Sequence, residues 1–496
     1  MTISGYQPRP IVSSATLRAL KRHRIADLER LAHIVIVPLP VRIYPQNVRL
    51  VYLKCKETCL CSVRMLVRSP FTMVAVAFVV RLIYAFFTFH DMPVPAGNHY
   101  TLGYGEVGFI AASVASGHGY SSPLGVESGP TAWITPAFPL LLAAFFKIFG
   151  VYSREASIGI HLINMLFSSL TCYPIFLLGK RLFGNAAGVV ASWFWAFLPQ
   201  AVFLPVVWVW DTSLSALTLV ICLLATYAIE GRENARSWAG YGALWGFATM
   251  VNAAVLSVFP GCLLFAAYRA RQRGADWLKL ATFAVIAFAL LLSPWIVRNQ
   301  IVFHRQVTLR SNLGLELWLG NNPEVPDSWS WWLHPTDSGK ERDEFLRIGE
   351  VAYMQEKKAA AVLFIKTHPA DTLRFQYHRF METWTGNVDA LADVWRGAKF
   401  WLRAKLLLNY VQTLLMLLGL LFARRNNPLL SIPLLTTIVL FPVVYYVCHT
   451  TIRYRHPIDP VVVVLAAYSV VCLARALRGW IVSAQANRHP AVSAPV

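Results

Sequence analysis

The stretch GYGEVGFIAASVASGHGYSSP, from Gly103 to Pro123, follows the first long apolar run of the chain. It places a single acid, Glu106, among small residues beside the expected membrane. Apolar residues recur after this acid at helical spacing, which predicts a short helix on the membrane surface with Glu106 near its N-terminus. A negative charge is favoured at that end of a helix. The chemistry open to Glu106 then depends on which side of the membrane it faces.

The composition indicates an all-α polytopic membrane protein. Of the 496 residues, 56% are hydrophobic and 14% are charged, whereas soluble domains average about 25% charged residues. The net charge of +20 is concentrated in the N-terminal 70 residues and in short loops between apolar runs. This distribution is typical of membrane topology and not of nucleic-acid binding, so no nucleic-acid partner is expected.

A helix needs about 20 mostly apolar residues to cross a bilayer. Interfacial helices in the first outer loop can raise the total, so we expect about 10–13 membrane helices. The candidate spans in the sequence are 71–89, 156–178, 185–204, 211–229, 238–251, 253–268, 278–294, 404–423, 429–447 and 457–476.

The short basic loops fix the expected orientation, because such loops stay on the cytoplasmic side. With ten spans and a cytoplasmic start, all five short basic loops fall on the cytoplasmic side. These loops carry the basic residues at 180–181, 232–236, 269–273, 424–425 and 475–478. The outer face then receives loop 90–155, the turn before Asp211, the segment 295–403 and the loop 448–457. We therefore expect a multi-pass protein of the cell (inner) membrane whose catalytic face is extracytoplasmic.

The segment 294–402 has 13 acids, 13 bases and eight tryptophans, so a small water-exposed domain is predicted there. Residues 1–64 are basic and irregular, and two interpretations stay open: a misannotated extension upstream of a start at Met65, or a disordered cytoplasmic tail. The expected organisation is an extension at 1–64, a transmembrane module at 65–294 with its catalytic outer loop at 90–155, an extracytoplasmic domain at 295–403, C-terminal transmembrane helices at 404–480 and a cytoplasmic tail at 481–496.

Two acids on the outer side of this topology stand at the start of expected helices. Asp211 opens a span directly after LPVVWVW, so it shares a face with Glu106. Two such carboxylates can divide the roles of general base and metal ligand, which makes both residues candidates for catalysis and for a divalent cation. The alternative is that each acid only caps or stabilises the start of a helix.

Cationic residues on the same side suit a phosphate. Arg453, Arg455 and His456 stand outside at the start of the last span, against the positive-inside tendency. Arg298 adds charge where another span leaves the outer leaflet, and Arg81 is the clearest charge within a span. All five are candidate phosphate-binding residues, and snorkelling to lipid headgroups is the alternative for the loop 453–456.

Amides and aromatic rings indicate carbohydrate contacts, because amides bind hydroxyls and an aromatic face packs on a pyranose ring. The candidates for a sugar or acceptor are His118, Trp133, Asn312, Trp318 and Asn321. His334, His368 and His378 are scattered without metal-ligand spacing, and each is interpreted as structural. There is no P-loop or dinucleotide fingerprint, so no nucleotide cofactor is expected.

Five motifs in this order resemble bacterial members of glycosyltransferase family 39, which are similar to the dolichyl-phosphate-mannose protein mannosyltransferases and the aminoarabinose transferase of lipid A. The likeness covers roughly 65–480. The motifs are GYGEVGFIAASVASGHGYSSP at 103–123, GPTAWITPAFPLLLAAFFKIFG at 129–150, WDTSL at 210–214, SPWIVRNQIVFHRQVTLRSNLGLELWLGNNP at 293–323 and RYRHPIDP at 453–460.

This resemblance implies a GT-C-type transmembrane bundle with interfacial helices in the first outer loop. It implies a polyprenyl-phosphate sugar donor, an acceptor that is a lipid, glycan or protein, inverting transfer and often a divalent metal. An acid in the first outer loop serves as base in the family, and Glu106 occupies that position. Gly105 stands where many members have a second acid, and Thr135-Pro136-Ala137 replaces a Lys or His before a double Pro. The phosphate contact is therefore expected from Arg298, Arg453 or Arg455.

The alternatives come from other classes. A polyprenyl-lipid transporter or flippase would place polar groups within its spans and show two halves of related sequence, and no internal repeat is present. A non-catalytic receptor would use the segment 295–403 as a binding module, without outward charges gathered beside the bilayer in three loops. The sequence thus favours the transferase.

Overall fold

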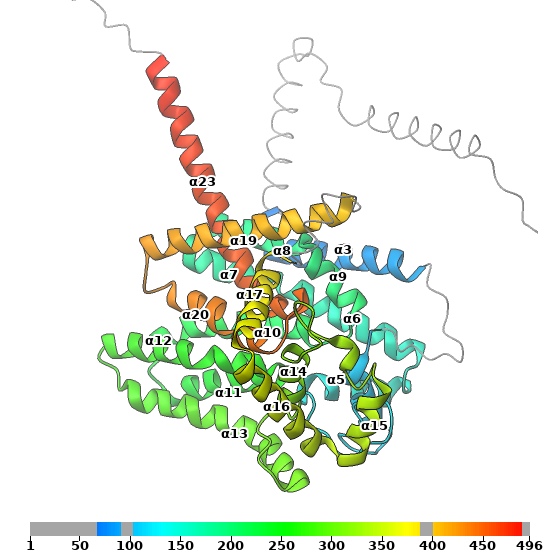
Figure 1. Ribbon diagram of the computed structural model, residues 1–496. Helices are drawn as coiled ribbons and strands as arrows, with labels where there is room; N and C mark the ends of the chain where they lie inside the picture. Colours follow the sequence, from blue (N-terminus) through cyan, green and yellow to red (C-terminus); the bar gives the residue numbers. More distant parts are fainter. Residues whose placement is uncertain (1–66, 91–102, 387–399, 489–496) are drawn as a thin grey trace, which may run out of the picture. The chain divides into compact units, whose positions relative to one another are not determined.

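The computed structural model describes residues 67–90, 103–386 and 400–488. The chain divides into two compact units, Met1–Val67 and Arg68–Val496, and everything below concerns the second. The extension predicted for 1–64 lies outside the described residues. Within them the structure is helical (Figure 1), with one isolated bridge between Ser121 and Pro130. The predicted all-α membrane fold is confirmed.

The N-terminal membrane module is built from helices that follow one another with short breaks. The pair α6–α7 reads as one 30-residue span, and α8 and α9 are bent by 43° at Leu198. The helices are α3 (Pro70–His90), α6 (Arg154–Leu170), α7 (Cys172–Phe183), α8 (Asn185–Phe197), α9 (Pro199–Val207), α10 (Thr212–Ala228), α11 (Ala235–Val251), α12 (Phe259–Gln272) and α13 (Trp277–Phe303).

The number of spans is lower than the ten expected. Within the described residues, seven helices are long and apolar enough to cross a membrane, or eight if the bent α8–α9 pair is one span. The predicted span 238–251 is the 17-residue helix α11, shorter than the roughly 20 residues typical of a span. The predicted span 429–447 is broken at Pro442 into α20 (Ile432–Leu440) and α21 (Val443–Val447). Proline interrupts a helix because it lacks an N–H donor.

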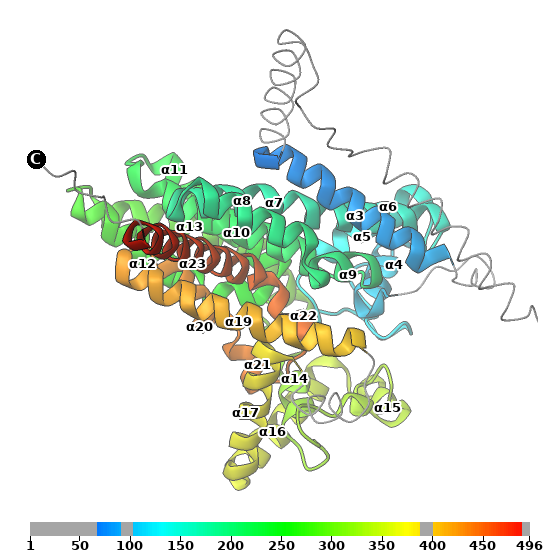
Figure 2. The same cartoon turned by 90° about the horizontal axis from the view of Figure 1, so that it is seen from above.

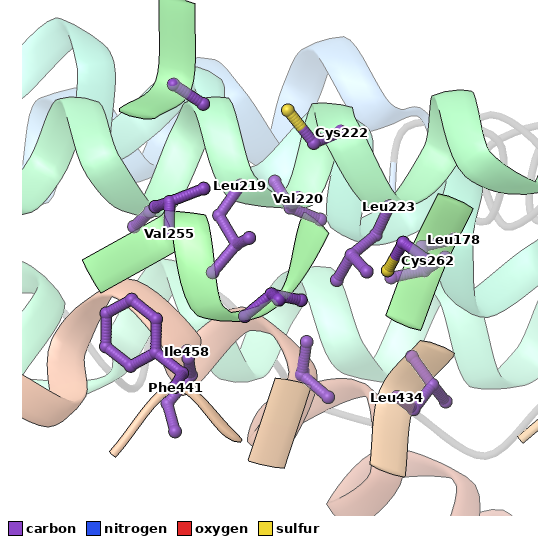
Figure 3. Packing of buried hydrophobic residues seen from close by; sticks show 14 of the residues in the cluster. Leu178, Leu219, Val220, Cys222, Leu223, Val255, Cys262, Leu434, Phe441 and Ile458 are labelled. Carbon is purple, nitrogen blue, oxygen red and sulfur yellow. The ribbon is translucent and has the colours of Figure 1, made fainter. Parts of the chain in front are cut away.

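The hairpin formed by α11 and α12 turns at Asn252, whose side-chain oxygen accepts from the N–H of Ala254 at 3.0 Å. The apolar core lies between α10, α12 and α20, where Leu223, Cys262 and Leu434 are fully buried (Figure 3). The buried thiol of Cys262 packs there as a small hydrophobe.

The first outer loop carries two helices at the predicted places, α4 (Gly105–Ala115) and α5 (Ala137–Phe149), which pack against each other. At 11 and 13 residues both are too short to cross a bilayer. A second apolar cluster forms around them, with Trp133 and Phe138 almost fully buried. This cluster fixes the position of the first turn of α4, and with it Glu106.

The segment predicted as an extracytoplasmic domain is also helical, and α14 packs on α16. Figure 2 shows α17 beside α19 and α21, and α23 alongside α19. The helices of this segment and of the C-terminal part are α14 (Leu313–Gly320), α15 (Gly339–Ile348), α16 (Glu350–Thr367), α17 (Pro369–Thr385), α19 (Phe400–Asn426), α22 (Ile452–Arg455) and α23 (Asp459–Arg488).

The close approach of α11 and α13 supplies a test of the packing. A Cβ atom at Gly242 would overlap the carbonyl oxygen of Ala284, whereas a Cβ at Gly240 on the same helix meets no atom within 4 Å. We expect Gly242→Ala to lower stability by about 1–3 kcal/mol through overpacking. Gly240→Ala should leave stability unchanged or raise it by up to about 1 kcal/mol, because alanine favours helix. Thermal unfolding in detergent measures both, and equal melting temperatures would contradict the packing.

Candidate active site

A cavity of about 2110 Å³ opens among the first outer loop, the start of α10 and the outer helices. It brings together five of the residues predicted from the sequence: Glu106, Trp133, Asp211, Asn312 and Arg453. A further part of its wall is apolar and comes from membrane helices, with side chains that include Phe197, Phe203, Leu204, Leu256 and Leu408. The cavity therefore joins a charged end to an apolar flank.

Glu106 lies in the first turn of α4 with 14% of its side chain exposed. Its Oε1 is 3.4 Å from Nε2 of His334. Nδ1 of the same ring lies 2.7 Å from Oγ1 of Thr336 and 3.2 Å from its backbone nitrogen, so the imidazole is held between Thr336 and Glu106. The histidine interpreted from sequence as structural thus orients the acid of the first outer loop.

Asp211 immediately precedes α10, but its side chain does not cap that helix. Oδ2 accepts from Ser215 Oγ and from Asn252 Nδ2, both at 3.0 Å. Burial raises the pKa of Asp211, although these hydrogen bonds and the charges of Arg310 and Arg453 oppose the increase. Asp211 is therefore a more protonated acid than an exposed aspartate.

Arg453 is the predicted phosphate ligand that the structure places in the cavity lining. Its guanidinium lies over the rings of Trp210 at 4.5 Å and Trp208 at 5.1 Å from the centroids. Aromatic faces hold a cation without neutralising it. The charge of Arg453 is thus positioned by tryptophans and stays available to an anion in the cavity.

Glu316 also places a charge in the cavity lining, although it was not among the site residues predicted from the sequence. Glu316 accepts from Asn312 Nδ2 at 2.5 Å and lies 3.8 Å from Arg310. His449 Nε2 is 2.5 Å from the other oxygen of Glu316. One signal was present in the sequence, since Glu316 is a lone acid within the apolar run LGLELWLG. Nothing in the sequence pairs it with His449, because 133 residues separate the two.

Two predicted phosphate ligands are engaged elsewhere and do not line the cavity. Arg81 is buried among membrane helices and donates to Ser168 Oγ at 3.0 Å and the Ala77 carbonyl at 2.8 Å. Arg298 donates to the carbonyls of Thr131 at 2.7 Å and Tyr120 at 2.9 Å. Arg298 therefore braces the first outer loop from α13, and its phosphate role has no support from the cavity.

Arg455 and His456 are likewise buried outside the cavity lining. Arg455 Nε donates to Asp459 Oδ1 at 2.8 Å, and His456 Nδ1 lies 3.2 Å from Oδ2 of the same acid. The ring of His456 stacks on Trp195 at 5.1 Å. These contacts give both residues a structural task at the start of α23.

The remaining predicted sugar contacts lie away from the cavity lining. His118 is exposed, and the Trp318 ring carries the Lys357 ammonium 4.1 Å from its centroid. Asn321 Nδ2 donates to the Val447 carbonyl at 2.9 Å. The structure gives Trp318 and Asn321 other partners, so Trp133 and Asn312 are the sugar candidates that the cavity retains.

The metal predicted at Glu106 and Asp211 finds no matching donor set. Among the described residues, no group of three or more His, Cys, Asp or Glu side chains is arranged to hold a metal ion. Asp211 already accepts two hydrogen bonds, and the Glu106 carboxylate lies against the imidazole of His334. The reaction proposed below therefore contains no metal step.

Comparison with known proteins agrees with the sequence motifs. Residues 132–297, about a third of the chain, match the model of the dolichyl-phosphate-mannose-protein mannosyltransferase family. The predicted resemblance to this class of glycosyltransferase is confirmed. The matched segment runs from the first outer loop to the end of the N-terminal membrane module and contains Asp211 and Asn252. No curated protein matches the sequence.

Solved structures that match this chain are distant in sequence and have TM-scores below 0.5. The oligosaccharyltransferase of Archaeoglobus fulgidus in complex with Zn and sulfate is 15% identical with a TM-score of 0.48, over 85% of this chain and 51% of that one. The same organism's AglB with an inhibitory peptide and a dolichol-phosphate gives 16% and 0.45, over 86% and 52%. ArnT from Cupriavidus metallidurans bound to undecaprenyl phosphate gives 14% and 0.33, over 86% and 81%. The chain thus spans about half the length of the two oligosaccharyltransferase structures.

The Glu316 carboxylate supplies a pH test of the site. Burial opposes its ionisation, but His449, Arg310 and His334 outweigh burial and lower the pKa from 4.5 to about 2. A depressed pKa stabilises the folded state above about pH 4.5, and this contribution is lost as the pH falls towards 2. We expect Glu316→Gln to be less stable than wild type at pH 7, with the difference shrinking below pH 4.5.

Thermal unfolding at pH 7, 4 and 3 measures this difference. Glu127→Gln is the matched control, because Glu127 is exposed and forms no ion pair with any described residue. A Glu316→Gln difference that does not change with pH would contradict the ionised pair.

Proposed function

We propose that this chain is a membrane glycosyltransferase that moves a sugar from a polyprenyl-phosphate donor to a lipid, glycan or protein acceptor, with inversion. The observation that carries the proposal is the cavity, in which carboxylates such as Glu106 and Asp211 and cations such as Arg453 share a space with an apolar wall of membrane helices. A lipid-linked sugar needs both environments at once, an apolar one for its chain and a charged one for its phosphate. The family match over 132–297 supports the same class of donor.

The proposed reaction is a direct displacement at the anomeric carbon. Glu106 accepts the proton of the acceptor hydroxyl or amine as the acceptor atom bonds to that carbon. The bond from the anomeric carbon to the phosphate oxygen breaks, and its electron pair leaves with the polyprenyl phosphate. Attack opposite the leaving group inverts the anomeric centre. The imidazole of His334, 3.4 Å from Oε1, holds the carboxylate of Glu106 at the cavity wall.

Arg453 stabilises the negative charge that grows on the leaving phosphate. Its aromatic neighbours Trp208 and Trp210 hold the guanidinium in place before the substrate arrives, so little reorganisation is needed. Asp211, whose pKa is raised by burial, is proposed to bind the donor beside the base. Two carboxyl groups with different environments can take different roles in one site.

The catalytic face is proposed to be extracytoplasmic, in the cell (inner) membrane. Glu230 lies just beyond the C-terminal end of α10, whereas Asp211 precedes its N-terminal end. Glu230 pairs with Arg269 and lies 3.9 Å from Arg181 and Arg273. These arginines belong to the short basic loops that stay on the cytoplasmic side. The cavity is at the Asp211 end of the same helix and so faces the opposite side.

Transfer of label tests the proposal. Purified protein receives radiolabelled polyprenyl-phosphate sugars and extracted membrane acceptors, and Glu106→Gln is run beside the wild type. Loss of a general base typically lowers the rate by about 10²–10⁴-fold, so the variant should lose turnover and keep donor binding. Glu127→Gln, an exposed acid of the same outer loop that does not line the cavity, should transfer at the wild-type rate.

Equal transfer by wild type and Glu106→Gln would keep the transferase class but remove the base from Glu106. Lipid binding without transfer by the wild type, across mannose, glucose and aminoarabinose donors, would contradict the transferase and favour the flippase.

A further inference from the structure

The pair Glu316 and His449 lines the cavity and has no part in the reaction described above. Glu316 comes from α14 of the outer segment, and His449 follows Cys448, the residue that ends α21. Their side chains meet at 2.5 Å between Oε2 and Nε2. Two elements far apart in the sequence therefore converge on one hydrogen bond at the cavity wall.

The protonation state of the pair follows from its surroundings. The second oxygen of Glu316 accepts from Asn312 Nδ2 and faces Arg310. Both contacts favour the charged carboxylate, as does the short contact to His449. A carboxylate carries no proton, so the hydrogen in that contact belongs to Nε2. Nδ1 then carries a lone pair in the neutral imidazole or a second N–H in the imidazolium, and either form can pair with a hydroxyl group.

The ring of His449 is not free to turn so that Nδ1 finds another partner. Trp329 stacks on it at 4.5 Å with an interplanar angle of 7°, and Tyr454 lies 5.5 Å away. Only 3% of the side chain is exposed. The hydrogen bond to Glu316 sets the direction of the ring, and the stacked indole sets its plane.

Nδ1 of His449 is buried and has no hydrogen-bond partner among the described residues. Leaving a buried acceptor unpaired costs about 1–3 kcal/mol, and most buried polar atoms in proteins are paired. An oriented polar atom without a protein partner, on a residue that lines a substrate-sized cavity, indicates that a ligand group completes it.

We propose that the Glu316–His449 pair is a subsite that forms a hydrogen bond at Nδ1 with a hydroxyl group of the substrate. The inference rests on the proposed function, because it assigns part of the same cavity. The hydroxyl belongs either to the sugar of the donor or to the acceptor. A site built to pair with a hydroxyl rejects an analogue that lacks one, so the pair selects hydroxylated substrate.

Binding of defined lipids tests the subsite without relying on turnover. The probes are undecaprenyl phosphate alone and undecaprenyl-phosphate-linked mannose, glucose and aminoarabinose, titrated into wild type and variants in detergent. His449→Phe keeps an aromatic ring against Trp329 but removes both nitrogens. Glu316→Gln keeps the shape of the side chain but removes the charge that orients the imidazole of His449. His378→Phe is the control, because His378 lies outside the cavity lining.

If the hydroxyl belongs to the donor sugar, His449→Phe should lower the affinity for a sugar-linked lipid by about threefold to tenfold. This factor corresponds to the usual free energy of one neutral hydrogen bond. Undecaprenyl phosphate alone should bind as it does to wild type. Glu316→Gln should show a smaller loss in the same direction, which keeps the test open if His449→Phe does not fold. If the hydroxyl belongs to the acceptor, the variant should bind the lipids with unchanged affinity. Its KM for the acceptor should then rise by a similar factor, with kcat little changed.

The subsite is overturned if both variants bind every sugar-linked lipid as the wild type does and the acceptor KM is unchanged or no transfer occurs. It is also overturned if the variants bind undecaprenyl phosphate alone more weakly by the same factor. The pair would then maintain the shape of the cavity and would not recognise a hydroxyl group. A wild type that transfers no sugar but shows His449-dependent binding of a sugar-linked lipid would refute the transferase and keep the subsite.

Discussion

The guanidinium of Arg379 is the interaction on which the geometry of the cavity depends. It is fully buried and donates to the carbonyl of Ser328 at 3.0 Å and to those of Tyr446 and Val447 at 3.1 and 3.0 Å. It also donates to the carbonyl of Gly320. Planar guanidinium groups suit several acceptors at once. One side chain of α17 thereby ties the end of α14 to the segment that leads into His449 and Arg453, and so joins two walls of the cavity.

Much of the fold follows from the sequence because the bilayer imposes simple rules. A long apolar run must become a helix, and a short basic loop stays inside. These rules place Glu106 and Asp211 on one face, and the structure puts both in one cavity with Arg453. The count of spans fails at 238–251 and 429–447, since apolar composition does not reveal that one helix is short and the other is broken by Pro442.

The partners of the charged residues could not be predicted in the same way. Arg298 and Arg455 have the charge and the side expected of phosphate ligands, but backbone carbonyls and Asp459 already engage them. A sequence shows which residues carry charge and not which charges are already satisfied. His449 is the opposite case, because its importance depends on a contact to Glu316 that only tertiary packing creates.

An experimental structure with bound undecaprenyl phosphate tests the central assignment most directly. We predict the phosphate in the cavity, in contact with the guanidinium of Arg453 and near Glu106 and Asp211, with the lipid chain along the apolar wall that includes Phe203 and Leu408. Lipid phosphate bound outside this cavity, or at Arg298 or Arg455 with the cavity empty of lipid, would contradict the assignment of the site.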